Sequence, residues 1–193
     1  MDHIKMPCVL VVDDEPEVIE LFRMTLERED YRVSTALSYR SAIEIIDNED
    51  IDLVIADVYL DDVSPAFDGL TVSAYAKKKD KNIQIIIVTA QPNIEDIKKA
   101  GKLDVYDYLE KPVQIPGITR SSARAIERKI LLDESDELRR SLDFVRNQLQ
   151  QNKETFLKFT RELEEDKQRS EKKLEGDRKK LRKAVENIKL GVE

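Results

Sequence analysis

Short apolar runs recur along the first part of the chain, and each of them leads into polar residues. Residues 9–12, 54–56 and 85–88 are apolar without interruption. Runs of this length and composition are typical of strands that are buried on both faces, as in parallel sheets. Residues 31–37 and 105–109 are more mixed but also favour strands, so the pattern predicts five strands in all.

Helical patterns fill the intervals between these strands. Pro16 predicts the start of the first helix, Ser38 the N-cap of the second, and Gly69 the start of the third. Pro92 predicts the start of a short fourth helix that ends at Gly101. Strands that alternate with helices in this way predict an α/β fold with a parallel sheet and helices on both of its faces. The apolar residues of the first helix are expected to face the core: Val18, Ile19, Leu21, Phe22 and Leu26.

A different pattern begins after residue 118. From Thr119 to about Ile188 the chain is rich in charge and keeps apolar residues at steps of three and four, as in the seam of a coiled coil. Leu174 follows the end of this series by eleven residues, which indicates a stutter that locally unwinds the supercoil. The expected seam consists of Leu138, Leu142, Val145, Leu149, Asn152, Phe156, Phe159 and Leu163. Asn152 is a polar residue of the kind that fixes the register and strand number of a coil.

These patterns divide the chain into four parts. We predict a flexible N-terminus over residues 1–6, a globular domain over 7–130, a coiled-coil helix over 131–190 and a tail over 191–193. A long helix with an apolar seam is poorly stable alone in water, so we expect it to pair with a second copy and form a homodimer.

Composition narrows the class of protein further. The net charge of −7 is uneven, with −11 on residues 1–118 and +4 on the remainder. Cys8 is the only cysteine, which excludes an internal disulfide and fits a reducing compartment. No apolar stretch approaches the length of a membrane span, and the N-terminus lacks the apolar segment of a signal peptide. We therefore expect a soluble cytoplasmic protein without a membrane span.

Polar side chains with complementary chemistry follow the predicted strands. Asp13 and Asp14 follow the first strand, Asp57 ends the third, Thr89 ends the fourth and Lys111 follows the fifth. Because the carboxyl ends of parallel strands meet at one edge of a sheet, these groups are expected to converge. Clustered carboxylates repel each other, and Mg²⁺ suits a few carboxylates together with water and phosphate oxygens. An aspartate in such a place can act as a nucleophile toward a phosphoryl group.

This series of residues resembles the receiver domain of two-component response regulators over residues 7 to about 130. The resemblance lies in the acidic pair Asp13 and Asp14, in Asp57, in Thr89-Ala90, in Lys111-Pro112 and in Tyr108, three residues before the lysine. It implies a flavodoxin-like, doubly wound, five-stranded parallel sheet with the strand order 2-1-3-4-5. It also implies a signalling domain and not an enzyme. The only reactions expected of this domain are self-phosphorylation and self-dephosphorylation.

The resemblance also implies a role for each of these residues. Asp57 would accept a phosphoryl group from the phosphohistidine of a histidine kinase or phosphotransfer protein, and Thr89 and Lys111 would contact its oxygens. Thr89 and Tyr108 would then change position and alter the face formed by helix 4, strand 5 and helix 5, which would pass the signal to the coiled coil. Mg²⁺ would be held by Asp14, Asp57 and the backbone carbonyl of Tyr59, with Asp13 assisting through water.

Two other classes of function remain open from the sequence. One is an aspartate-nucleophile phosphatase of the haloacid-dehalogenase type, which this chain fits poorly because Tyr59 stands where such enzymes have a second aspartate. The other is a coiled-coil scaffold, or partner-docking protein, with a passive or degenerate receiver head. The basic run 178–183 is typical of a solvated helix face, so we expect no direct DNA binding.

Overall fold

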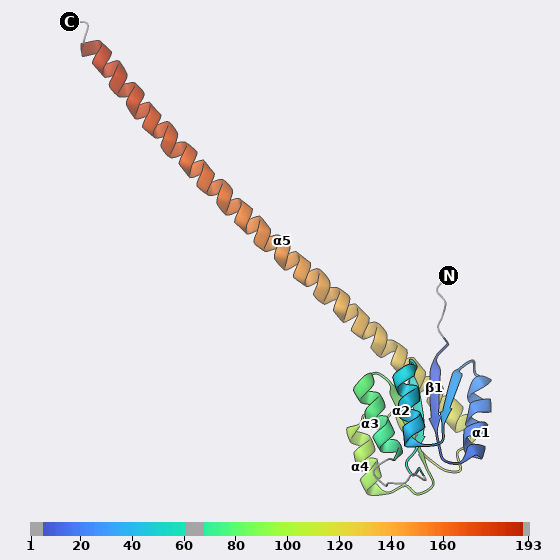
Figure 1. The fold of residues 1–193 in the computed structure, drawn as a ribbon. Coiled ribbons are helices and arrows are strands. Elements are labelled where there is room, and N and C mark those ends of the chain that lie inside the picture. The colour runs from blue at the N-terminus through green and yellow to red at the C-terminus, as the bar shows by residue number, and fades with distance from the viewer. Residues whose placement is uncertain (1–5, 61–67, 191–193) are drawn as a thin grey trace. The chain divides into compact units, whose positions relative to one another are not determined.

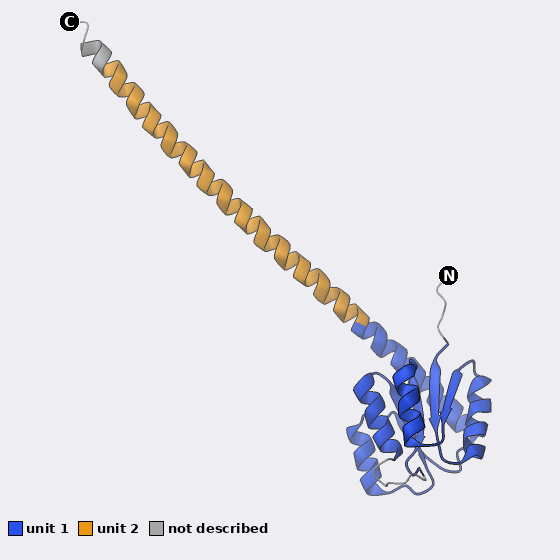
Figure 2. Ribbon diagram, viewed as in Figure 1, with its two compact units in different colours: residues 1–136 blue, residues 137–193 orange. Residues whose placement is uncertain are grey.

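The computed structural model describes residues 6–60 and 68–190, with side chains as far as residue 186. Most of the predicted N-terminal tail, most of the loop after the third strand, and the C-terminal tail lie outside these residues. The chain forms two compact units, residues 1–136 and residues 137–193 (Figure 2). Among the described residues, the first unit holds the sheet, four short helices and the start of a long helix, and the second unit holds the rest of that helix.

The sheet has five parallel strands in the order β2-β1-β3-β4-β5. Their bounds are Cys8–Val12 for β1, Arg32–Ala36 for β2, Leu53–Asp57 for β3, Gln84–Thr89 for β4 and Asp107–Glu110 for β5. Every residue of β1, β3 and β4 is buried, as their uninterrupted apolar sequences predict. The predicted fold class and strand order are confirmed.

Within the part of the chain that the structure describes, five helices alternate with the strands (Figure 1). They are α1 (Pro16–Glu27), α2 (Tyr39–Asn48), α3 (Gly69–Lys79), α4 (Ile94–Lys102) and α5 (Ile115–Leu190). Buried residues of α2, α3 and α4 pack in one core cluster with one face of the sheet. Buried residues of α1 and of the first turns of α5 pack in a second cluster on the other face. The sheet is therefore covered on both sides, which is the doubly wound arrangement.

Local signals set most of the helix starts. Pro16 is the first residue of α1, where its missing N–H has no intrahelical partner to lose. Ser38 caps α2, because its hydroxyl accepts a hydrogen bond from the Ser41 N–H while the Ser41 hydroxyl reaches back. Asp68 caps α3, and Gly69 is the first residue inside that helix.

Several boundaries differ from those that the sequence predicts. Helix α4 begins at Ile94 and not at Pro92, because Asn93 provides the N-cap, and it continues through Gly101 to Lys102. Strand β5 begins at Asp107, two residues later than predicted, where pairing with β4 starts. Leu21 on α1 is 45% exposed and does not belong to the inward stripe of that helix.

The long helix α5 runs through both units as 76 continuous residues. In unit 2 the side chains of the predicted seam are exposed, from 54% at Leu163 to 69% at Leu149 and Phe156. Among the residues that the structure describes, no helix combines the length and the apolar character that a membrane span requires. The predicted long helix is confirmed, whereas its pairing into a coil stays a prediction.

Within unit 1, a cluster of charged residues fixes α5 to the turn between α3 and β4. The buried Lys129 ammonium donates to Asp80 at 2.7 Å and to Asp133 at 2.6 Å. The Asn82 amide donates to Asp133 at 2.9 Å and to Asp136 at 3.0 Å. Burial by itself would raise the pKa of Asp80, but hydrogen bonds from Lys129 and from the Asn82 N–H hold it below its usual value.

Gly69 allows α3 to approach the end of β3 at very close range. A Cβ atom added at Gly69 would lie 1.8 Å from the backbone oxygen of Asp57, whereas one added at Gly101 meets nothing within 4 Å. We expect Gly69→Ala to lower the free energy of unfolding by about 1–3 kcal/mol, because backbone must shift to relieve the clash. Gly101→Ala should instead raise it by up to ~1 kcal/mol, because alanine is the better helix former.

Urea denaturation followed by tyrosine fluorescence checks this pair of substitutions. All six tyrosines lie between residues 31 and 108, so the signal reports on unit 1 and not on the long helix. Equal stability of the two variants would contradict the close approach at Gly69.

Candidate functional site

Three carboxylates meet where β1 and β3 end. Asp13 and Asp14 follow β1, and Asp57 is the last residue of β3. Each offers one ligand oxygen, and these oxygens all lie within 4.8 Å of one another. Asp13 and Asp57 are only 2% and 6% exposed, while Asp14 is half-buried. The edge of the sheet therefore concentrates negative charge in a place largely withdrawn from water.

Lys111, which follows β5, brings a positive charge into this cluster. Its ammonium lies 2.6 Å from Asp57 Oδ2, 2.9 Å from Asp13 Oδ2 and 3.1 Å from Glu15 Oε1. Burial acts to lower the pKa of Lys111, but the hydrogen bonds and charges of Asp13 and Asp57 outweigh it and raise the pKa well above its ordinary value. The side chain is therefore a permanent cation in the middle of the site.

One lysine does not neutralise this group of acids. Burial raises the pKa of Asp13, and the nearby charge of Asp57 adds to the rise, while Lys111 and the Glu15 N–H oppose it without cancelling it. Keeping Asp13 ionised in this site therefore costs free energy. A further cation next to the carboxylate would lower that cost. The electrostatics of the site favour the binding of a positive ion.

The donor set suits Mg²⁺. This ion prefers one or two carboxylates and keeps several waters or phosphate oxygens in its shell. One oxygen of each buried carboxylate is held by a backbone hydrogen bond. Asp57 Oδ1 accepts from the Tyr59 N–H at 3.0 Å, and Asp13 Oδ1 accepts from the Glu15 N–H at 3.0 Å. The half-buried Asp14 leaves the cluster open to water on one side. Asp13, Asp14 and Asp57 therefore fit the metal, while ligation by the Tyr59 carbonyl stays a prediction.

Thr89 lies beside the cluster at the end of β4. In the pairing of β3 with β4, Asp57 is opposite Val88, so Thr89 is one residue beyond it. Thr89 is completely buried, its hydroxyl accepts the Gln91 N–H at 3.2 Å, and its carbonyl accepts the Lys111 N–H at 2.8 Å. The second of these hydrogen bonds holds the start of the lysine loop next to the threonine. Thr89 and Lys111 are thus neighbours, as the sequence predicts.

Tyr108 points into the domain from β5. It pairs with Ile87 in the sheet, and its ring packs against the core cluster under α2, α3 and α4. Its hydroxyl is buried and has no hydrogen-bond partner among the described residues. Burial raises the pKa of Tyr108, and the charge of Asp96 on α4 raises it further. The hydroxyl is therefore a buried donor in the direction of α4 without an acceptor.

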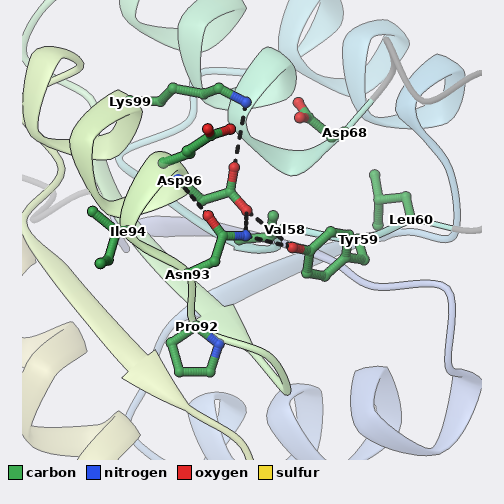
Figure 3. Close-up of a pocket in the computed structure, with 10 residues that line it drawn as sticks. Val58, Tyr59, Leu60, Asp68, Pro92, Asn93, Ile94, Asp96 and Lys99 are labelled. Carbon is green, nitrogen blue, oxygen red and sulfur yellow. Dashed lines mark hydrogen bonds and ion pairs between the residues drawn. The ribbon is translucent and has the colours of Figure 1, made fainter.

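A hydrogen-bonded network that sequence reasoning missed connects the site to α4 (Figure 3). The hydroxyl of Tyr59, two residues after Asp57, donates to Asp96 at 3.0 Å and accepts from the Asn93 amide at 2.7 Å. Asp96 is 6% exposed, and its backbone N–H donates to the Asn93 side chain at 2.8 Å, which forms the N-cap of α4. An asparagine followed three residues later by an acid is a capping pattern that could have revealed the pair.

Beside this network is an open pocket of about 650 Å³ (Figure 3). Its lining includes the rings of Tyr59 and Pro92, the apolar side chains of Leu60 and Ile94, and the ammonium group of Lys99. The pocket is bounded by the end of β3 and the start of α4, so the position of α4 determines its shape.

Comparison with known proteins identifies the fold and its family. The family model of the response regulator receiver domain matches residues 9–121. The chain belongs to the response regulator receiver family. The matched segment of this receiver contains all the candidate site residues, from Asp13 to Lys111.

The relatives of this receiver include regulators of bacterial transcription and nitrogen assimilation. The transcriptional regulatory protein GlrR of Escherichia coli is 32% identical over 127 residues, which are 66% of this chain and 28% of that protein. The nitrogen assimilation regulatory protein NtrX of Azorhizobium caulinodans is 30% identical over 131 residues, 68% of this chain and 28% of that protein. The chain thus spans little more than a quarter of the length of either relative.

Solved structures match the same region. A receiver domain protein of Clostridium thermocellum is 29% identical with a TM-score of 0.60, and the match covers 66% of this chain and 99% of that one. NtrX of Brucella abortus, solved with ADP, is 28% identical with a TM-score of 0.62, and the match covers 69% of this chain and 30% of that one. The receiver identity is confirmed, whereas the role of each site residue stays a prediction.

Proposed function

We propose that this receiver is a phosphorylation switch in which Asp57 accepts a phosphoryl group from the phosphohistidine of a histidine kinase or phosphotransfer protein. The observation that carries the proposal is the contact of Asp57 with the Lys111 ammonium, 2.6 Å apart, inside a cluster of three carboxylates. Such a group of buried acids and one cation has no evident structural purpose at a sheet edge, and perturbed charges of this kind cluster at functional sites.

Each residue then has a defined part in the transfer. A carboxylate oxygen of Asp57 attacks the phosphorus, and the bond from phosphorus to the donor nitrogen breaks. The Lys111 ammonium, which Asp13 and Glu15 also hold in place, stabilises negative charge on the phosphoryl oxygens, and the buried Thr89 hydroxyl donates to one of them. Mg²⁺ bound by Asp13, Asp14, Asp57 and the Tyr59 carbonyl would neutralise the remaining charge.

Incubation with acetyl phosphate and Mg²⁺, followed by intact-mass measurement, tests the transfer. We expect the wild type to gain one phosphoryl group, and Asp57→Asn to gain none because its amide is not a nucleophile. Lys111→Ala and Thr89→Ala should slow the reaction, each by roughly 10²-fold, as the loss of one donor to a developing oxyanion does. Asp14→Asn, or omission of Mg²⁺, should slow it as well.

The matched control is Asp47→Asn, which changes an exposed aspartate on α2 to asparagine and should react like the wild type. Phosphorylation that persists in Asp57→Asn would remove the proposed acceptor. No phosphorylation of the wild type would instead favour the alternative of a coiled-coil scaffold, or partner-docking protein, with a passive or degenerate receiver head. We expect no turnover of a generic phosphate ester, in keeping with a signalling domain.

We further propose that the long helix pairs with a second copy to form a homodimer. The support is the row of seam residues, whose apolar side chains are all more than half exposed in unit 2. An isolated helix with such a face gains little stability in water, whereas burial in a coil removes the face from solvent. A cytoplasmic dimer without direct contact to DNA is the assembly that we expect.

Two leucines on α5 allow the seam to be compared with the rest of the helix surface. Leu149 lies on the seam and is 69% exposed, whereas Leu157 lies off it and is 56% exposed. We expect Leu149→Ala to weaken dimerisation by about 2–5 kcal/mol for each buried leucine lost, and Leu157→Ala to leave it almost unchanged. Analytical ultracentrifugation across a concentration series measures both. Equal effects of the two variants would contradict the seam.

The phosphorylation state would reach the coil through the face formed by α4, β5 and α5. The support is that Ser121 on α5 donates to Asp107 on β5 at 2.6 Å, and that α5 continues without interruption to the seam. Beryllofluoride, a phosphoryl mimic, should therefore change hydrogen exchange in residues 138–163 of the wild type but not of Asp57→Asn. Identical exchange with and without the mimic would contradict coupling.

A further inference from the structure

The seam of α5 defines the heptad positions of the helix. Leu142, Leu149, Phe156 and Leu163 occupy a positions, and Leu138, Val145, Asn152 and Phe159 occupy d positions, because the steps between them alternate between three and four residues. The residues that flank the seam then fall into two further rows, at positions e and g. These two rows decide which way a partner helix can run.

The two flanking rows differ in charge. The e row consists of Arg139, Arg146, Lys153, Thr160 and Lys167. The g row over the same heptads consists of Ser141, Gln148, Thr155 and Glu162. Apart from the half-buried Thr160, all of these side chains are exposed in the structure. One edge of the seam is therefore basic, and the other is neutral to acidic.

We propose that two copies of α5 pair in parallel and in register, with each basic e row beside the g row of the partner. This inference rests on the proposed homodimer and adds its direction and alignment. In a parallel pair, each g residue faces the e residue of the next heptad in the other helix. Arg146 then lies opposite Ser141, Lys153 opposite Gln148, and Lys167 opposite Glu162. No like charges meet, and the last pair attracts.

An antiparallel pair places the same residues badly. In that arrangement e faces e and g faces g, so two basic rows lie side by side along the coil. Like charges at such short separations repel each other, and the e row contains no acidic residue that would offset this repulsion. The charge pattern thus disfavours the antiparallel arrangement and leaves the parallel one without a penalty.

Asn152 supports the same alignment. In a parallel pair in register, the two Asn152 amides occupy one layer and can hydrogen-bond to each other. If the parallel pair shifts in register, each Asn152 amide faces an apolar side chain of the other helix and has no hydrogen-bond partner. The same is true of an antiparallel pair that is not centred on Asn152. A buried amide that lacks a hydrogen bond is costly, so burial of Asn152 in the seam favours the aligned pair.

Two single-cysteine additions test the direction. Leu138→Cys places a thiol at the start of the seam, and Leu163→Cys places one at its end, ~37 Å away along the helix at 1.5 Å per residue. The wild type is the control, because its only cysteine, Cys8, is completely buried in the sheet. Each variant is oxidised mildly alone and in an equal mixture with the other, and products are identified by peptide mapping.

We expect each variant alone to form a disulfide-linked dimer, at a level roughly tenfold or more above the wild type, because only thiols with Cα atoms within ~7 Å can be bridged. An antiparallel pair would instead give product only in the mixture, as a link from 138 to 163, and this result would overturn the inference while leaving the homodimer intact. Sedimentation as a monomer at the same concentration would overturn the homodimer itself. Sedimentation as a trimer or a larger species at the same concentration would overturn two-stranded pairing.

A charge-reversed variant gives a second measurement that needs no cysteine. Arg146→Glu with Lys153→Glu makes part of the e row acidic. In a parallel coil these residues face Ser141 and Gln148, so mixing with the wild type should give nearly random exchange of subunits. In an antiparallel coil the acidic row would meet the basic row of the wild type, and heterodimers would predominate over either homodimer. Native mass spectrometry distinguishes these outcomes.

Discussion

The ion pair between Lys111 and Asp57 is the interaction on which the site depends. Parallel strands direct their carboxyl ends to one edge of the sheet, and this chain places acids after two of them. Without a cation, the buried Asp13 and Asp57 would repel each other in surroundings where water screens poorly. The lysine after β5 supplies that cation, and a divalent ion together with a phosphoryl group would shift the balance of charge again.

The surroundings of this ion pair connect it to the start of helix α4. Tyr59 is two residues from Asp57, and its hydroxyl is bonded to Asp96 and Asn93 at the start of α4. The Tyr108 hydroxyl is buried nearby without an acceptor among the described residues. A buried polar group without a partner is costly, so this hydroxyl is an unsatisfied group near the satisfied network at the start of α4. Tyr59 therefore links the segment that follows Asp57 to the start of this helix.

The two parts of helix α5 differ in how far their apolar residues are buried. Up to Asp136 it belongs to the receiver, where Ile118, Ala125 and Ile126 are buried and Lys129 is held by Asp80 and Asp133. Beyond that point the apolar residues of the predicted seam are exposed. The pairing of this second part with another helix stays a prediction, whereas the contacts of the first part form within one chain.

The apolar runs were sufficient to predict the buried strands β1, β3 and β4, since a strand covered on both faces has no polar positions to obscure it. The boundaries of the other elements, and the inward face of α1, were harder to predict. Strand β5 is short and amphipathic, and its start at Asp107 is set by pairing with β4 and not by its own residues. Leu21 looked like a core residue from its spacing, yet it lies outside the part of α1 that touches the sheet. Helix α4 includes Gly101 but ends only one residue later, at Lys102, with Leu103 as its C-cap.

The order of the chemical groups along the chain determined the fold, the acidic site and the receiver family, because residue type, order and strand ends are local properties. Only the tertiary structure decided the rest: that Glu15 joins Asp13 and Asp57 around Lys111, that Tyr59 reaches Asp96, and that Gly69 lies against the Asp57 carbonyl. These contacts join residues from different elements, and their geometry depends on how helices settle on the sheet. No pattern within a single segment carries that information.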